Sequence, residues 1–227
     1  MIRQELVARQ LDEAIAAQFE VGRRLRVLDI GLGEGNQALR LVRAGHQVTG
    51  LESDPALLDV VRGALEQEPE GIRERFRIVP GDGQDTGAHF LPGTFDVVLC
   101  HSVLSESRDP ESTLAGLARV LDAGGLLSLV IPNVAARAMR AGRAADWEAT
   151  LAALAASEDS DRTLRLDPLT SLLTRIGAPL ERWYGVGVFC ADDAPAEEAA
   201  LDAEERAARV DPYRAVATSL HLCGVRG

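Results

Sequence analysis

Apolar residues follow two different spacings along the chain, and each spacing predicts one kind of element. Over residues 2–20, apolar positions from Leu6 to Phe19 recur at roughly helical intervals between polar residues. This pattern predicts an amphipathic helix. The run at 25–30 is instead short, rich in apolar and β-branched residues, and ends in glycines, which predicts a first β-strand.

Short apolar runs and helical patterns then alternate for about 130 residues. The predicted strands are 25–30, 46–51, 75–79, 94–100 and 126–131. The helices predicted between them cover 36–44, a segment that opens at 53–55, and 110–121. Strands that alternate with helices in this way form a parallel, doubly wound sheet.

The alternation stops at 134–160, an Ala/Arg-rich stretch that predicts one or two helices. A helix at 168–176 and two strand-like segments at 181–190 and 214–225 follow. We therefore expect one α/β domain over 1–227, with a Rossmann-like, doubly wound, seven-stranded sheet. It is mostly parallel, ends in an antiparallel C-terminal hairpin, and carries 134–160 as a helical lid.

Composition narrows the classes of partner. The 227 residues carry a net charge of −11, and all 24 basic residues are arginines. An acidic total lowers the expectation of a nucleic-acid substrate, because phosphate binding needs a basic surface. We interpret the acidic stretch 191–206 as a solvated helix face.

The sequence contains no targeting signal and no metal-binding motif. No apolar run is long enough to span a bilayer and the first residues do not resemble a secretion signal, so we expect a cytoplasmic protein with no membrane partner. Cys100, Cys190 and Cys223 lack metal spacing, and we expect no metal. Nothing in the pattern indicates an oligomeric state.

A glycine-rich loop follows the first predicted strand. Asp29 ends that strand, and glycines follow at Gly31, Gly33 and Gly35. Such a turn lets a ligand approach bare backbone and a helix N-terminus. The dinucleotide fingerprint places its third glycine one residue later, where this chain has Asn36. The spacing therefore favours the S-adenosylmethionine form of the loop over the nicotinamide or flavin form.

Polar residues at the ends of the next two strands support the same ligand. Glu52 ends the second strand, where a carboxylate can accept hydrogen bonds from both ribose hydroxyls. Asp82, Gly83 and Gln84 follow the third strand, where the adenine is usually held. We predict a methyltransferase with S-adenosylmethionine as cofactor and S-adenosylhomocysteine as product. A dehydrogenase and a non-catalytic, regulatory S-adenosylmethionine-binding protein are the alternatives.

Longer stretches of sequence resemble one family over nearly the whole chain. It is the family of bacterial tRNA 5-carboxymethoxyuridine methyltransferases, which methylate a carboxylate on a wobble uridine. The more specific matches are Arg3, the segment His101-Ser102-Val103-Leu104, and the strand Gly185-Val186-Gly187-Val188-Phe189.

The resemblance implies roles for individual residues. Arg3 is expected to pair with the methionine carboxylate of the cofactor, and His101 to contact the cofactor from beyond the fourth strand. The full set of expected cofactor-binding residues is Arg3, Asp29, Gly31, Leu32, Gly33, Gly35, Glu52, Asp82, Gly83, Gln84 and His101.

The chain departs from the family where the acceptor is expected to bind. The family's lysines before Arg162-Thr163-Leu164 are replaced by acidic residues, and Gly187 replaces an arginine. The family also continues beyond Leu104 into Glu-Trp, whereas this chain has Ser105-Glu106, and it carries residues ahead of the match to Arg3. The acceptor therefore stays open between tRNA and an anionic small molecule.

Candidate acceptor-binding residues come from the inserted stretch. Arg137, Arg140 and Arg143 fall at helical spacing and suit an anionic acceptor, and Tyr184 is a further candidate. No dedicated base is evident, although His89, Glu106 and Tyr184 are available. A carboxylate needs no base because it is already ionised at neutral pH. The expectation is therefore O-methylation of a carboxylate or similar group, with methylation of another metabolite as the alternative.

Overall fold

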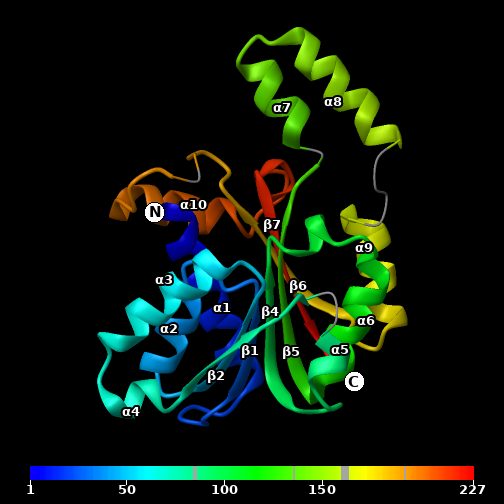
Figure 1. Cartoon of the computed structure of the whole chain (residues 1–227). Coiled ribbons are helices and arrows are strands. Elements are labelled where there is room, and N and C mark those ends of the chain that lie inside the picture. Colours follow the sequence, from blue (N-terminus) through cyan, green and yellow to red (C-terminus); the bar gives the residue numbers. More distant parts are fainter. Residues whose placement is uncertain (84–85, 135, 160–163, 192) are drawn as a thin grey trace.

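The computed structural model describes residues 1–83, 86–134, 136–159, 164–191 and 193–227. Seven strands form one sheet in the order β3-β2-β1-β4-β5-β7-β6 (Figure 1). β1 to β5 pair in parallel, whereas β7 runs antiparallel to both β5 and β6. The expected seven-stranded, mostly parallel sheet is thus confirmed. The strands are β1 (Arg26–Ile30), β2 (Gln47–Glu52), β3 (Phe76–Pro80), β4 (Phe95–His101), β5 (Leu121–Pro132), β6 (Leu180–Val186) and β7 (Ser219–Val225).

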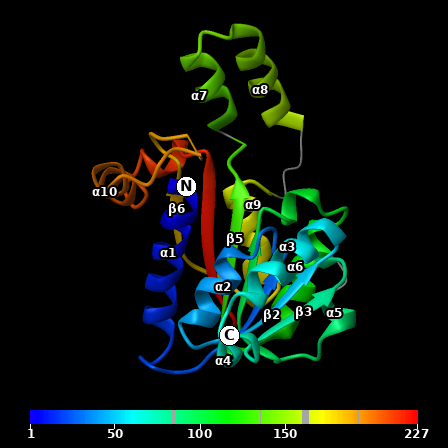
Figure 2. The ribbon, with the colours of Figure 1, turned by 60° about the vertical axis from the view of Figure 1, so that its left-hand side comes forward.

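Helices cover both faces of this sheet (Figures 1 and 2). One face packs against α1, α2 and α3, and the other packs against α6 and α9. None of the described helices combines the length and the apolar composition that crossing a bilayer requires. The helices are α1 (Ile2–Gln18), α2 (Asn36–Arg43), α3 (Pro55–Glu66), α4 (Glu70–Arg73), α5 (Thr86–His89), α6 (Pro110–Val120), α7 (Ala136–Arg143), α8 (Trp147–Asp159), α9 (Leu166–Arg175) and α10 (Glu198–Ala207).

The unbroken apolar run of β4 follows from its position between the two helical layers. Val97 and Leu99 belong to the cluster under α1 and α2, and Val98 and Cys100 belong to the cluster under α6 and α9. Successive side chains of a strand point to opposite faces, so a strand covered on both faces needs apolar residues at every position. The apolar pattern of 94–100 is thus the pattern of a strand covered on both faces, and β4 lies in the middle of the sheet.

Two helices form in the Ala/Arg-rich stretch, in agreement with the pattern. α7 and α8 pack against each other and stand beyond the carboxyl ends of the parallel strands (Figures 1 and 2). Their position places arginine-rich α7 next to the edge of the sheet where ligands of doubly wound folds bind.

The end of the chain is more elaborate than the simple hairpin that was expected. β6 stops at Val186 because Gly187 adopts a left-handed φ of 74°, and β7 begins only at Ser219. Helix α10 and a short 3-10 helix at Arg214–Val216 lie between them. The two strands pair antiparallel as predicted, but the predicted strand 181–190 is too long at its end and 214–225 is too long at its start.

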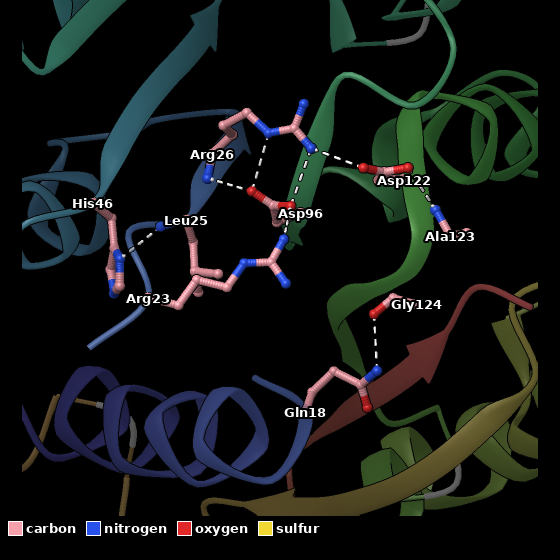
Figure 3. A network of polar contacts seen from close by, with 9 residues as sticks. All are labelled: Gln18, Arg23, Leu25, Arg26, His46, Asp96, Asp122, Ala123 and Gly124. Atoms are coloured by element: carbon pink, nitrogen blue, oxygen red, sulfur yellow. Dashed lines mark hydrogen bonds and ion pairs between the residues drawn. The ribbon is translucent and has the colours of Figure 1, made fainter. Parts of the chain in front are cut away.

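A charge network fastens the amino ends of β1 and β4, opposite the glycine loop (Figure 3). The buried Asp96 carboxylate accepts hydrogen bonds from the Arg26 backbone N–H (2.8 Å), the Arg26 guanidinium and the Arg23 guanidinium (2.8 Å). Burial alone would raise the pKa of Asp96, but these hydrogen bonds and charges hold it below its ordinary value. Asp96 is therefore ionised in the folded protein at neutral pH.

Candidate functional site

A cavity of about 340 Å³ opens at the carboxyl ends of β1, β2, β3 and β4. The parallel strands bring residues distant in sequence to one edge, so the glycine loop, Glu52 and His101 share a single wall. The size falls within the range of small-molecule sites. The lining residues are Gly31, Gly33, Leu51, Glu52, Ser53, Leu57, Gly81, Asp82, Gly83, His101, Ser102, Val103, Glu106 and Ser107.

The glycine loop needs glycine for conformation and for space. Gly31, Gly33 and Gly35 have φ angles of 70°, 53° and 78°, a region that side chains disfavour. A Cβ at residue 31 would also collide with the side chain of Val103. The loop therefore presents bare backbone to the cavity, as a ligand-binding turn requires.

Glu52 fixes the loop from the end of β2. Its carboxylate accepts hydrogen bonds from the backbone N–H groups of Gly33 (3.1 Å), Ser53 (2.9 Å) and Asp54 (3.0 Å). The side chain is 7% exposed and lines the cavity. A carboxylate held in place by three backbone donors, with an edge on the cavity, suits a ligand that offers two hydroxyl groups.

Other expected cofactor residues lie behind the cavity wall or outside the described residues. Asp29 and Leu32 are buried, and neither they nor Gly35 is among the residues that line the cavity. Leu32 instead packs on Gly50 of β2, where a Cβ would overlap its side chain. Gln84 lies outside the described residues.

Asp29 is a buried carboxyl group with an unusual proton affinity. Burial raises the pKa of Asp29 to about 8, and the negative charge of Glu52 adds to the shift. The folded protein therefore keeps Asp29 protonated at neutral pH, whereas the unfolded chain ionises it near pH 4. The difference predicts a pH-dependent cost of folding.

We expect the free energy of unfolding of the Asp29→Asn variant to lack the pH dependence that Asp29 causes. Between pH 6 and pH 8 the folded protein binds one proton more than the unfolded chain, so the free energy of unfolding falls as pH rises. Relative to the Asp29→Asn variant, the parent protein should lose about 2–3 kcal/mol over this interval, since each pH unit corresponds to about 1.4 kcal/mol. Urea unfolding of both proteins at pH 6, 7 and 8 measures the difference.

Asp96→Asn is the control, because the folded protein lowers the pKa of Asp96, whereas it raises the pKa of Asp29. Stabilisation from ionised Asp96 is present above the pKa of the unfolded chain and is lost as pH falls through the lower folded pKa. The difference between parent and Asp96→Asn should thus stay constant from pH 6 to 8 and shrink below pH 4. Equal slopes for the parent and Asp29→Asn between pH 6 and 8 would contradict the assignment of Asp29.

A second cavity, of about 330 Å³, continues from the first past His101 and Ser102, which line both. Arg3 lines its wall from the first turn of α1 and donates a hydrogen bond to the Ser102 hydroxyl (3.0 Å). The cationic Arg3 and the half-buried His101 thus line the same cavity. The lining residues are Met1, Arg3, Gln4, Val7, Gln37, His101, Ser102, Val130 and Asp193.

Ser102 lines both cavities, although the sequence predicted no binding role for it. Its φ of 71° is left-handed, which is uncommon for a residue with a side chain. Its backbone N–H donates to the Val130 carbonyl (2.7 Å), and its hydroxyl accepts from Arg3. Strained residues of this kind cluster at functional sites. No local sequence pattern predicts a left-handed serine.

A third cavity, of about 470 Å³, lies between α7 and the segment that follows β6. Arg140 and Arg143 line it together with apolar side chains such as Met139 and Phe189, and Asp193 is shared with the second cavity. Neither Arg137 nor Tyr184 is among its lining residues, and Tyr184 is only 3% exposed on β6. Of the four expected acceptor-binding residues, two therefore meet at one cavity.

The three candidate bases lie in different surroundings. Glu106 lines the first cavity, His89 is exposed on α5, and the Tyr184 hydroxyl is buried. Burial raises the pKa of Tyr184 to about 12, so its phenol is a poor base at neutral pH. Among the described residues, these candidates do not converge on one reacting atom.

Comparison with known proteins gives this geometry a family context. Residues 28–129, which span β1 to β5, match the family model described as "Methyltransferase domain". The chain is also 30% identical over 234 residues to the tRNA 5-carboxymethoxyuridine methyltransferase of Escherichia coli K12, covering 97% of this chain and 87% of that protein.

Two further similarities are partial or structural. The ubiquinone biosynthesis O-methyltransferase of Xanthomonas euvesicatoria is 34% identical over 108 residues, covering 48% of this chain and 43% of that protein. The glycopeptide N-methyltransferase MtfA, solved with S-adenosylhomocysteine, superposes with a TM-score of 0.62 at 15% identity, covering 98% of this chain and 89% of that one.

Proposed function

The chain belongs to the S-adenosylmethionine-dependent methyltransferases, in the family of the tRNA 5-carboxymethoxyuridine methyltransferase, and from this membership we propose that it methylates an oxygen atom of an anionic acceptor. The observation that carries the proposal is that the three cavities are neighbours: His101 and Ser102 line the first and second, and Asp193 lines the second and third. They run from the glycine loop, past Arg3 and His101, to Arg140 and Arg143.

The residues of the first two cavities fit the cofactor. The Glu52 carboxylate suits ribose hydroxyls, the bare backbone at Gly31 allows close approach, and the Arg3 guanidinium suits the methionine carboxylate. When bound, S-adenosylmethionine supplies a methyl group on a positively charged sulfur, which leaves as neutral S-adenosylhomocysteine.

The third cavity suits an acceptor with a negative charge and an apolar part. Its guanidinium groups, Arg140 and Arg143, have no ion-pair partner in the part of the chain that the structure describes, and Phe189 offers an apolar wall. Guanidinium groups bind carboxylates in two-point hydrogen bonds. An ionised oxygen carries its own reactive lone pair, so the protein needs only to orient it and exclude water. None of the three candidate bases lines this cavity, which fits an acceptor that needs no base.

Transfer RNA is the first candidate acceptor. The full-length relative acts, by its name, on a tRNA uridine, and helix α7 carries three arginines and no acidic residue. Trp147, which opens α8, is 65% exposed, and exposed aromatic rings stack on unpaired bases. A small anionic metabolite is the second candidate, favoured by the net charge of −11 and by the ubiquinone-pathway relatives.

Methyl-labelled S-adenosylmethionine tests these candidates. The protein is incubated with total tRNA or with a panel of small carboxylates and phenols, and the labelled product is treated with mild alkali. Alkali releases label from a methyl ester as methanol but leaves aryl ethers and N-methyl groups intact. Alkali-labile label in tRNA supports the proposal for tRNA, and label in a small acid supports the metabolite. Transfer confined to nitrogen would refute O-methylation.

We expect Arg140→Gln and Arg143→Gln each to weaken acceptor binding. Both side chains are exposed, so water screens part of the lost charge–charge interaction and the KM for the acceptor should rise about three- to tenfold per arginine. The affinity for S-adenosylhomocysteine, which the first two cavities would hold, should stay unchanged. Steady-state kinetics and calorimetric titration measure the two quantities.

Arg137→Gln is the matched control from the same helix. If the acceptor is small, Arg137→Gln should leave KM unchanged, because Arg137 does not line the cavity. If the acceptor is tRNA, all three variants should weaken its binding. Removing one arginine–phosphate interaction should then make the slope of log K for tRNA binding against log salt concentration shallower by about one. Unchanged KM in Arg140→Gln and Arg143→Gln would place the acceptor elsewhere.

A further inference from the structure

A buried row of polar side chains leads from α1 across β7 and β5 to His101 at the cavity wall. His221 contacts the Gln10 side-chain oxygen through Nδ1 (2.9 Å) and the Ser128 hydroxyl through Nε2 (2.8 Å). The same hydroxyl contacts His101 Nε2 (2.8 Å). Gln10, Ser128 and His221 are each 0% exposed. None of these three residues belongs to a sequence motif of the site, and none lines one of the three cavities.

Each contact in this row has a defined direction. The Gln10 NH₂ group donates to the Gly185 carbonyl (3.2 Å), which can only accept, so the Gln10 oxygen faces His221 and accepts from its Nδ1–H. Burial lowers the pKa of His221 to about 3, so the ring is neutral and its Nε2 is a bare acceptor. The Cys223 thiol, a weak donor, lies 3.6 Å from this Nε2, whereas the Ser128 oxygen lies at 2.8 Å, where two lone pairs would repel, so the Ser128 hydroxyl donates its one proton to His221.

The direction of the last contact follows from the single proton of Ser128. Because that proton points to His221, the Ser128 oxygen accepts from His101, and His101 carries its proton on Nε2. Burial, together with neighbouring positive charges, lowers the pKa of His101 well below its ordinary value. A neutral ring with Nε2–H has a free lone pair on Nδ1.

We infer that Gln10, His221 and Ser128 are positioning residues that lock His101 in its Nε2–H tautomer, so that His101 Nδ1 accepts a hydrogen bond from the α-ammonium group of the cofactor. Nδ1 has no hydrogen-bond partner among the described residues, and the ring lines both the first and the second cavity. Arg3 lines the second cavity beside it, so a donor for a carboxylate and an acceptor for an ammonium group lie together. This pair is complementary to an α-amino acid.

The row cannot work as a path for protons. It ends at the Gln10 amide, which neither takes up nor releases a proton at neutral pH, and whose NH₂ group is used by Gly185. Its effect is therefore to set the direction of hydrogen bonds. If His101 took the other tautomer, its Nδ1–H would face the ammonium group, and two donors would repel each other.

Nitrogen NMR of protein labelled with ¹⁵N-histidine tests the lock directly. The chain has only four histidines, so the His101 signals can be assigned from their loss in His101→Gln. We expect a protonated Nε2 and an unprotonated Nδ1 in the ligand-free protein. Adding S-adenosylhomocysteine should shift the Nδ1 signal, and adding its analogue without the α-amino group should not. A protonated Nδ1 in the parent protein would overturn the inference without any variant.

Ser128→Ala cuts the row and tests its role in binding. The His101 signals should then show a mixture of tautomers, and the affinity for S-adenosylhomocysteine should fall in proportion to the loss of the Nε2–H form, about twofold for an equal mixture. The affinity for the deamino analogue should not change. Ser219→Ala, a buried serine on β7 outside the row, is the matched control and should behave like the parent.

Comparing S-adenosylhomocysteine with its deamino analogue distinguishes a loss of His101 positioning from a general loss of structure. An equal loss of affinity for both ligands in Ser128→Ala would mean that the row only supports the fold, and it would overturn the inference. These measurements use no methyl acceptor, so their outcome is independent of the proposed O-methylation.

Discussion

The Gly31→Ala variant is expected to lose about 100-fold in affinity for S-adenosylhomocysteine. A left-handed φ of 70° costs a residue with a side chain about 1–2 kcal/mol. The new Cβ would also overlap the Val103 side chain, and such overpacking costs about 1–3 kcal/mol. The loop can relieve both only by moving its backbone away from the cavity. About 2.8 kcal/mol of lost binding corresponds to this factor of 100. Calorimetric titration measures it.

Two further variants distinguish the backbone strain from the steric overlap as causes of the lost affinity. Gly45→Ala has the same left-handed constraint (φ 101°) but open space around its Cβ, and Gly45 lines none of the three cavities of the site. It should lose about 1–2 kcal/mol of stability and keep its affinity. Adding Val103→Ala to Gly31→Ala removes the overlapping methyl groups and should recover part of the binding. If Gly31→Ala binds like the parent, the loop does not approach the ligand closely.

The part of the site that the sequence predicted is the part that local rules govern. A parallel sheet brings the carboxyl ends of its strands to one edge, so Glu52 and His101 had to meet the glycine loop. The register bears this out, since Ile30 pairs with both Leu51 and Cys100, each one residue before them. Strand order and periodicity were sufficient to place these residues on one wall.

The parts that the sequence did not predict depend on contacts between distant residues. The contact between Gln10 and His221 joins positions 211 residues apart, and neither side chain follows a local pattern. The direction of each hydrogen bond in that row also depends on burial, which has no local signature. Likewise, the left-handed Ser102 is bonded to two residues far away in the sequence: its backbone N–H donates to the Val130 carbonyl, and its hydroxyl accepts from Arg3.

Helix α10 shows how a compositional rule can hide a specific role. The interpretation of 191–206 as a solvated face is wrong at Glu204, which is 0% exposed. Its carboxylate accepts hydrogen bonds from the backbone N–H groups of Val188 (2.8 Å), Phe189 (2.8 Å) and Cys190 (2.7 Å). Charge counting did not separate this glutamate from its exposed neighbours, because only the fold brings the three donors to it.

Glu204→Ala should therefore be among the most damaging substitutions in the chain. It leaves three backbone donors without their acceptor, and each unsatisfied buried donor costs about 1–3 kcal/mol. With partial access of water to the loop, we expect a loss of about 4–5 kcal/mol in the free energy of unfolding. Val188, Phe189 and Cys190 line the third cavity, so acceptor binding should weaken as well. Urea unfolding and acceptor KM measure the two effects.

Two further variants make this prediction specific to the carboxylate. In Glu204→Gln one oxygen can still serve Phe189 and Cys190, but the new NH₂ group faces the Val188 N–H, so about half of the loss should remain. Glu205→Ala removes a neighbouring acid that pairs with Arg9 at the surface, and it should cost less than about 1 kcal/mol. Cofactor affinity should be unchanged in both, since neither of the first two cavities is lined by Val188, Phe189 or Cys190. If Glu204→Ala and Glu205→Ala proved equally mild, the loop would be held by its own backbone rather than by Glu204.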